Sequence, residues 1–247
     1  LAGVELGVFD RLGEGASDAG TLARDLTVQE RGIEILCDAL TALGYLTKDG
    51  AGVYANTPDT DAYLVRGRPD SQAFIMGHRG RMFRTWAELD ETIRHGRAVR
   101  EQDKLTLTDR KTNRNFILGM AEVSRKRTGP ILDRLPLADA ETFVDLGGGP
   151  AHYACEAVRR HPDLEALLVD LPLTVEVANE YIAGEGLGDR IATQVTDFYR
   201  AEAVELPWPA DVMLISQVLH AEGVDENRAL LRKVAPAVRP GGTVAIV

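Results

Sequence analysis

The stretch that most constrains the fold is residues 142–158, TFVDLGGGPAHYACEAV. It begins with a short apolar run of β-forming residues. It continues through Gly147, Gly148 and Gly149 into a helical pattern, for which Pro150 suits the first position. The glycines allow positive φ angles and leave no side chain in the way of a ligand. A strand, a glycine turn and a helix start expose backbone N–H groups at the positive end of a helix dipole. The stretch is therefore typical of a site for an anionic or polar group.

Two carboxylates at the ends of predicted strands indicate the kind of ligand. Gly147-x-Gly149 matches the first part of a dinucleotide fingerprint, but His152 stands where the third glycine would be. Asp145 precedes the turn and suits a ligand ammonium, and Asp170 follows Gly149 by 21 residues. A carboxylate at about that spacing accepts hydrogen bonds from both hydroxyls of a ribose. A ligand that carries a ribose, an ammonium group and a carboxylate of its own matches S-adenosylmethionine better than NAD.

The second part of the chain alternates strands with helices, which predicts a parallel, doubly wound sheet with right-handed crossovers. The predicted strands are Phe143–Leu146, Ala166–Asp170, Ile191–Val195, Val212–Ser216 and Thr243–Val247. The predicted helices between them are Ala151–Arg160, Leu173–Glu185 and Glu226–Val238. Ligands bind such a sheet at the carboxyl ends of its strands. The polar residues at those ends are Asp145, Asp170, Asp197, Ser216, Gln217 and His220.

The first part of the chain has the pattern of a winged helix-turn-helix, with three helices and a hairpin. The predicted helices are Leu1–Leu12, Leu22–Leu26 opened by Asp18, and a third that Thr27 caps with Glu30 at its third position. The dipeptide Asp49-Gly50 predicts the hairpin turn.

Four further elements are expected before the glycine turn. They are a helix from Thr57-Pro58 to Leu64, a helix over Ser71–Gly96, a linker over Arg97–Thr108, and a helix over Thr112–Arg127 closed by Gly129-Pro130. On periodicity alone, Met120 of the last helix belongs to the core. We therefore expect a mainly α domain over residues 1–105 and an α/β domain over residues 106–247.

Charge and composition exclude several classes of protein. The formal net charge is −10, and the third helix carries Glu30, Glu34 and Asp38 against Arg31. Phosphates would repel that helix, so we expect no nucleic-acid partner. No apolar run approaches the roughly 20 residues that a membrane helix needs, and nothing resembles a signal peptide. A cytoplasmic protein without a membrane partner is the expectation, although a chain that starts at Leu1 leaves a lost leader open.

The two cysteines and the last strand add two expectations. Cys37 and Cys155 fall in different predicted domains, which argues against a disulfide, and two thiols alone cannot form a four-ligand zinc site, so no metal is expected. The chain stops inside the apolar strand Thr243–Val247, which would leave an unpaired sheet edge. We expect the natural protein to continue beyond it.

Six motifs along the chain, taken in order, resemble one known family. They are Asp145-Leu-Gly-Gly-Gly-Pro, Val169-Asp-Leu-Pro, Asp197-Phe198, Pro209-Ala-Asp-Val-Met-Leu-Ile-Ser, Val218-Leu-His220 and Arg239-Pro-Gly-Gly. The chain resembles the S-adenosylmethionine-dependent O-methyltransferases of the plant caffeate/chalcone type and their bacterial relatives. The resemblance implies a Rossmann-like class I methyltransferase domain after a winged-helix dimerisation domain, hence a homodimer. It also implies methyl transfer to a hydroxyl of a small, aromatic or polyketide-like molecule, with S-adenosyl-L-homocysteine as the cofactor product.

The resemblance also implies roles for residues that match the family's motifs. Gly147, Gly148 and Gly149 would hold the methionine part of the cofactor, Asp170 its ribose and Leu171 its adenine. The other implied cofactor contacts are Asp197 and Phe198 at the adenine, Ser216 ahead of the histidine, and Met120 and Ser124 on the helix before the turn. His220 would be the general base, since an imidazole that titrates near neutrality can take the proton of a hydroxyl acceptor.

Departures from the family pattern keep alternatives open. His220-Ala221-Glu222 replaces the usual His-Asp-Trp, and Ala151 stands where a further glycine is common. The carboxylate that would orient the histidine is unidentified; Glu222 or Asp225 could substitute. The alternatives are a cofactor-binding relative with another acceptor or without methylation, an NAD-type oxidoreductase, and a winged-helix regulator.

Overall fold

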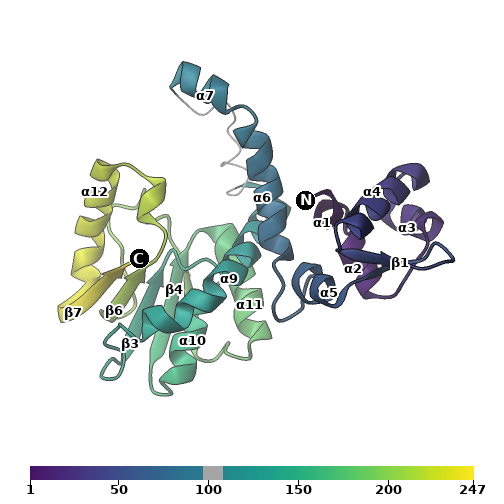
Figure 1. The fold of residues 1–247 in the computed structure, drawn as a ribbon. Helices are drawn as coiled ribbons and strands as arrows, with labels where there is room; N and C mark the ends of the chain where they lie inside the picture. Colours follow the sequence, from purple (N-terminus) through teal and green to yellow (C-terminus); the bar gives the residue numbers. More distant parts are fainter. Residues whose placement is uncertain (97–107) are drawn as a thin grey trace. The chain divides into compact units, whose positions relative to one another are not determined.

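The computed structural model describes residues 1–96 and 108–247, and the chain divides into two compact units, Leu1–Gln102 and Asp103–Val247 (Figure 1). The predicted domain boundary after residue 105 lies outside the described residues. So does the predicted linker Arg97–Thr108, apart from Thr108. None of the described helices is long and apolar enough to cross a membrane.

The first unit consists of short helices and one hairpin around a small apolar core. In chain order its elements are α1 (Ala2–Leu6), α2 (Val8–Gly13), α3 (Ala19–Leu26), α4 (Glu30–Ala42), β1 (Leu46–Lys48), β2 (Tyr54–Asn56), α5 (Pro58–Leu64), α6 (Ala73–Trp86) and α7 (Leu89–His95). Apolar residues recurring at helical spacing, among them Val8, Leu22 and Ile33, form this core.

Local sequence signals fix several of these boundaries as predicted. The carboxylate of Asp18 accepts a hydrogen bond from the Thr21 amide at 2.8 Å and caps α3. The hydroxyl of Thr57 accepts one from the Thr60 amide at 3.3 Å, with Pro58 at the first position of α5. Strands β1 and β2 pair antiparallel around the Asp49 turn, so the predicted hairpin is confirmed.

Three predicted helices of this unit have wrong boundaries. The predicted helix Leu1–Leu12 is two helices, because Gly7 at φ 78° ends α1. The predicted cap at Thr27 is wrong as well: Thr27 ends α3 in the left-handed region, at φ 56°, and α4 begins only at Glu30. The predicted helix Ser71–Gly96 is interrupted between Trp86 and Leu89.

The second unit contains the parallel sheet expected from the alternating pattern. Its elements in chain order are α9 (Arg110–Leu132), β3 (Thr142–Leu146), α10 (His152–Arg160), β4 (Glu165–Asp170), α11 (Pro172–Gly184), β5 (Ile191–Val195), β6 (Ala210–Ile215), the 3-10 turn η1 (Leu219–Ala221), α12 (Val224–Val234), the 3-10 turn η2 (Ala235–Ala237) and β7 (Val238–Ile246). In the described part of the unit, the strand order is β5-β4-β3-β6-β7, with every pairing parallel.

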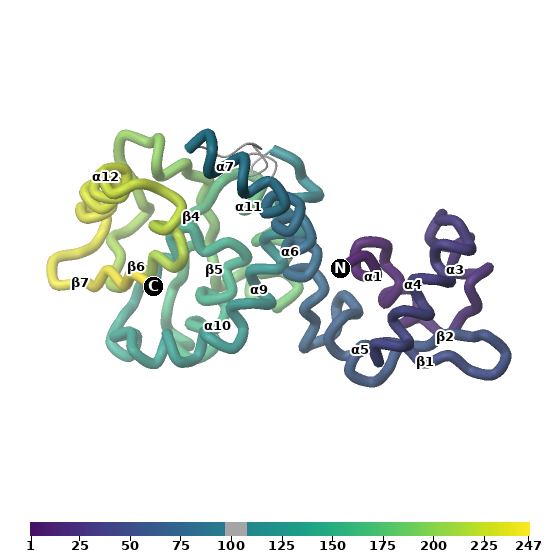
Figure 2. Tube along the Cα trace, turned by 45° about the horizontal axis from the view of Figure 1, so that its top comes forward, coloured from purple at the N-terminus to yellow at the C-terminus, as the bar shows by residue number. Residues whose placement is uncertain are grey.

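Helices cover both faces of this sheet, as a parallel sheet requires. Side chains from α9, α10 and α11 pack with one set of strand residues, and side chains from α12 pack with the other set. Figure 2 shows α12 beside β6 and β7, apart from α10 and α11. Strand β3 lies at the centre and all its residues are buried, which explains its uninterrupted apolar pattern.

Strand register places the two carboxylates on one face. Side chains alternate along a strand, so Asp145 points to the same side as Phe143, which packs in the cluster containing α10. Asp145 lies opposite Leu168 of β4, and Asp170 is two residues further along that strand and on the same face. Both carboxylates therefore reach the carboxyl edge of the sheet on the α10 side.

Several helix ends in this unit also differ from prediction. The predicted helix Glu226–Val238 ends at Val234, because residues 235–237 form η2 and Val238 already belongs to β7. Pro150 is not the first residue of α10, because Ala151 takes a left-handed conformation, φ 64° and ψ 25°, and the helix starts at His152. Helix α9 does not close at Gly129-Pro130 but continues to Leu132. Leu132 is buried in the sheet's core, and that burial offsets the hydrogen bond that Pro130 cannot make.

The left-handed Ala151 generates a stability prediction. Glycine at 151 would relieve roughly 1 kcal/mol of backbone strain while losing a buried methyl group worth about the same, so we expect Ala151→Gly to change stability by less than about 0.5 kcal/mol. Ala154 is equally buried but lies inside α10, where glycine costs about 1 kcal/mol in addition to the lost methyl group. Urea unfolding of both variants should show Ala154→Gly less stable than Ala151→Gly; equal losses would contradict the strain argument.

Candidate functional site

The candidate site lies where β3 and β4 end and the glycine turn begins. The amide of Gly147 donates to the carbonyl of Val169 at 2.7 Å, which extends the strand pairing into the turn. The carboxylate of Asp170 accepts hydrogen bonds from the amides of Gly149 at 2.9 Å and Leu171 at 2.7 Å. Asp170 therefore bridges the turn after β3 and the start of α11. The geometry places Asp170 beside the glycine turn, as its spacing predicted, and Leu171, which the family resemblance had implied, follows it directly.

Asp145 is completely buried, and neither of its carboxylate oxygens makes a hydrogen bond of ordinary geometry in the described part of the chain, although the Ala154 amide favours its charged form. Its carboxylate lies directly beneath Gly148. A Cβ atom at position 148 would lie 2.2 Å from the Asp145 carboxyl carbon. Glycine is required there because any side chain would collide with the carboxylate.

Burial of two carboxylates in one place raises both pKa values. Desolvation, followed by the charge of the neighbouring Asp170, raises the pKa of Asp145 to about 7. Desolvation raises the pKa of Asp170 to about 6, although the amides of Leu171 and Gly149 favour its charged form. A ligand that brings a positive charge to Asp145 would satisfy a group that the protein leaves unpaired. The chemistry of this site therefore fits an ammonium group beside a diol, as in S-adenosylmethionine.

Two further side chains border the turn. A Cβ atom at Gly147 would lie 2.5 Å from Cγ2 of Val218 and 3.3 Å from Cζ of Phe198. Phe198 is buried and follows β5 as predicted. Val218 belongs to a motif that the sequence analysis singled out, but its position beside the glycine turn was not predicted. The Asp197 carboxylate accepts a hydrogen bond from the Arg200 amide at 3.1 Å, so it caps its own loop.

Ser216 lies at the end of β6, and its hydroxyl is 3.4 Å from the hydroxyl of Tyr153 on α10. Both residues are buried, so Tyr153 brings a second hydroxyl to the edge of the sheet. The sequence did not single out Tyr153, because its aromatic ring matches the apolar face of α10.

Helix α9 brings Ile117 near the turn, with its Cδ1 4.0 Å from where a Cβ of Gly149 would lie. Met120 is half-buried one turn further along, and the hydroxyl of Ser124 donates to the Met120 carbonyl at 2.8 Å. Helix α9 therefore lies beside the turn, as expected, but Ser124 is bonded within its own helix.

His220 is exposed on η1, after β6. Among the residues that the structure describes, no hydrogen bond or ion pair involves its imidazole. Asp225 pairs with Arg228 at 3.3 Å, and no contact joins Glu222 to the imidazole in the same residues. Neither carboxylate that could have oriented His220 therefore does so.

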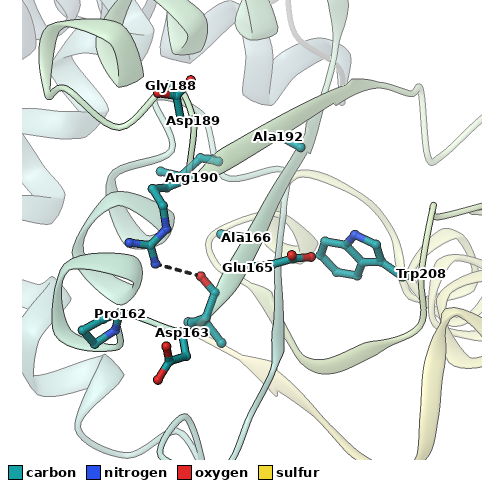
Figure 3. A pocket seen from close by; sticks show the side chains of 11 residues that line it. Pro162, Asp163, Glu165, Ala166, Gly188, Asp189, Arg190, Ala192 and Trp208 are labelled. Carbon is teal, nitrogen blue, oxygen red and sulfur yellow. Dashed lines mark hydrogen bonds between the residues drawn. The ribbon is translucent and has the colours of Figure 1, made fainter.

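A separate hollow lies at the opposite edge of the sheet, where β4 and β5 begin (Figure 3). Arg190 crosses it and donates to the Leu164 carbonyl at 3.1 Å, while the acidic side chains Asp163, Glu165 and Asp189 are exposed. Ligands of parallel sheets bind at the carboxyl ends of the strands, so this hollow is not the candidate site.

Comparison with known proteins identifies relatives of both units. A family model described as the O-methyltransferase domain matches residues 86–247, and one described as the O-methyltransferase dimerisation domain matches residues 1–66. The chain is 32% identical over 252 residues to a 3-hydroxy-5-methyl-1-naphthoate 3-O-methyltransferase from Streptomyces sahachiroi, covering 99% of this chain and 71% of that protein.

Solved structures with 25% or more sequence identity share the fold, among them two methyltransferases. Human N-acetylserotonin methyltransferase, in complex with S-adenosylmethionine, has a TM-score of 0.81 and 26% identity over 99% of this chain and 73% of that chain. Mitomycin 7-O-methyltransferase has a TM-score of 0.83 and 28% identity over 99% of this chain and 74% of that chain.

The raised pKa of Asp145 predicts a pH-dependent stability difference. As pH rises above the ordinary value of 3.8, the unfolded chain releases this proton, while the native protein keeps it until about pH 7. The contribution of Asp145 to the free energy of unfolding is therefore fully present below about pH 4 and is lost as pH rises to about 7. We expect the stability advantage of Asp145→Asn over wild type to grow by about 2–3 kcal/mol between about pH 5 and about pH 8.

Urea unfolding at both pH values measures this difference. The exposed Asp163, changed to Asn, is the matched control and should show no such growth. A constant difference between Asp145→Asn and wild type would mean that Asp145 does not keep its proton in the native state.

Proposed function

The chain belongs to the O-methyltransferase family and is an S-adenosylmethionine-dependent enzyme. From this premise we propose that it methylates a hydroxyl group of a small aromatic or polyketide-like molecule. We propose His220 as the general base of this reaction. The observation that carries the proposal is the buried, unpartnered carboxylate of Asp145 beside Gly148 and Asp170. The NAD-type oxidoreductase alternative is disfavoured, because a dinucleotide fingerprint would have a glycine at the position of His152.

Each residue of the site has a distinct part in holding the cofactor. We assign Asp145 to the cofactor ammonium, the glycine turn to its methionine portion and Asp170 to the ribose hydroxyls. Phe198 and Leu171 lie at the ends of loops beside the turn and border the adenine in this proposal. Asp197, Ser216, Met120 and Ser124 are further proposed contacts.

S-adenosylmethionine, when bound, supplies a methyl group on a sulfonium that is already activated. The protein's remaining tasks are to align the acceptor oxygen and to remove its proton. His220 is exposed and its ring nitrogens are free of hydrogen bonds within the described residues, so its imidazole can accept that proton. General-base help of this kind is typically worth about 10²–10⁴-fold in rate.

The acceptor class follows from the relatives. One is named for a hydroxynaphthoate, one for N-acetylserotonin and one for mitomycin, all of which are small molecules with ring systems. We propose an acceptor of the same class for this chain. The departure at Ala221 and Glu222 makes a shifted acceptor position the main variation to expect.

We further propose that the protein is a cytoplasmic homodimer. The match of residues 1–66 to a dimerisation domain supports self-association. The exposed Glu30 and Glu34 on α4, together with a net charge of −10, argue against a nucleic-acid partner.

Asp170→Asn tests the proposed cofactor site. The neutral amide cannot accept the same hydrogen bonds from a ribose diol and from the Gly149 and Leu171 amides, so we expect about 10- to 100-fold weaker binding of S-adenosylhomocysteine. Isothermal titration measures this affinity, with Asp163→Asn at the opposite edge of the sheet as control. Unchanged affinity, or tighter binding of NADH by the wild-type protein, would refute the assignment.

His220→Ala tests the proposed base. We expect turnover to fall by about 10²–10⁴-fold while the affinity for S-adenosylhomocysteine stays within about twofold of wild type. The assay follows S-adenosylhomocysteine formation with 3-hydroxy-5-methyl-1-naphthoate and with N-acetylserotonin as probe acceptors. His161→Ala, at the end of α10 near the opposite edge of the sheet, is the control. Full activity of His220→Ala would remove this histidine from the mechanism.

A further inference from the structure

The turn that carries His220 is held by one side chain from the next helix. Asn227 of α12 donates from its amide nitrogen to the Leu219 carbonyl at 2.7 Å and to the Glu222 carbonyl at 3.2 Å. These two carbonyls lie on either side of His220. The Asn227 amide group therefore links the main chain before His220 to the main chain after it.

A second residue fixes the orientation of this amide. The Tyr199 hydroxyl lies 3.0 Å from Oδ1 of Asn227 and donates to it. Burial, followed by the charge of Glu222, raises the pKa of Tyr199, so its hydroxyl stays protonated and remains a donor. Because Oδ1 accepts from Tyr199, the amide nitrogen must face the two carbonyls.

Tyr199 itself belongs to the loop after β5 and follows Phe198 directly. The two rings lie 5.4 Å apart, and Lys233 of α12 donates to the Tyr199 carbonyl at 2.6 Å. Helix α12 is thus bonded both to the loop proposed to meet the adenine and to the turn of the proposed base. These contacts join the loop after β5 to the turn after β6, two strands that do not pair with each other in the described residues.

The position of Asn227 argues against a purely packing role. It precedes the buried residues Leu230 and Val234 by three and seven residues, so it lies on the apolar face of α12. Asparagine is a poor residue inside a helix, and an aliphatic side chain would suit that face better. A polar amide at this position is explained by the three hydrogen bonds that it makes.

We infer that Asn227, oriented by Tyr199, is a positioning residue that holds the His220 turn in place for proton transfer. This inference rests on the proposed function, because it assigns the role through His220. Asn227 touches neither the cofactor nor the acceptor in this assignment. It acts on the main chain around the base.

Hydrogen–deuterium exchange of the protein without acceptor tests the hold itself. We compare the segment 218–223 in wild type, Asn227→Ala and Asn227→Asp, where Asp is isosteric and keeps the acceptor for Tyr199 but loses both donors. Exchange should become at least about fivefold faster in both variants, with and without S-adenosylhomocysteine, because the turn is released. Arg228→Ala, an exposed neighbour on the same helix, should leave exchange unchanged. Unchanged exchange in both Asn227 variants would overturn the inference.

A double-mutant cycle then separates positioning from general stability. Asn227→Ala and Asn227→Asp should lower kcat by about 10- to 100-fold and leave the Kd for S-adenosylhomocysteine within about twofold of wild type. In a His220→Ala background the same changes should lower kcat by less than about twofold, because the group being positioned is gone.

The outcomes distinguish the two claims. If His220→Ala lowers kcat, and Asn227→Ala lowers kcat by the same factor in the His220→Ala background as in wild type, the inference fails while the proposed base stands. If His220→Ala is fully active, the proposed base fails and the positioning role falls with it. We expect Arg228→Ala to keep the wild-type kcat and all variants to keep thermal midpoints within about 2 °C of wild type. These results would exclude general unfolding as the cause of the lower kcat of the Asn227 variants.

Discussion

The candidate site of the second unit is built around a carboxylate that the fold buries without a hydrogen-bond partner among the described residues. Asp145 lies in the central strand, completely shielded from water, and the adjacent Asp170 adds a second negative group at the same edge. Such burial is unfavourable for the charged form. Asp145 is buried because β3 is the central strand of the sheet. The register of β3 with β4 points the side chains of Asp145 and Asp170 to the same face. The glycine at 148 follows from this arrangement, since the carboxylate occupies the space of a side chain there.

The sheet could be predicted from the sequence, whereas many helix boundaries could not. Strands such as β3 and β4 are buried on both faces and appear as short apolar runs, which is typical of a parallel sheet covered by helices. Helix ends depend on competing local and tertiary terms. Pro130 is a strong stop signal, yet burial of Leu132 carries α9 past it. Thr27 is a good cap by composition, but its backbone is left-handed because it ends the preceding helix.

The position of the candidate site was predictable for a topological reason. Residues that follow parallel strands meet at one edge, so Asp145 and Asp170 could be placed together from their order in the chain. The contacts between loops could not be predicted, because the Tyr199–Asn227 pair spans 28 residues and depends on how α12 packs. One signal was available: a polar residue at the apolar spacing of Leu230 and Val234. Tyr153 left no such signal, since an aromatic residue belongs on a buried helix face.

The bonds from Asn227 end on main-chain oxygens, at Leu219 and Glu222. Main-chain oxygens are present whatever side chains a position carries, so residues 221 and 222 can be exchanged during evolution without loosening the turn. In this proposal the side chains at 221 and 222 are therefore not needed to hold the turn, which is consistent with Ala221 and Glu222 departing from the family pattern that the chain resembles. Divergence toward new acceptors would then be easiest at these two positions, next to a histidine whose backbone is anchored from elsewhere.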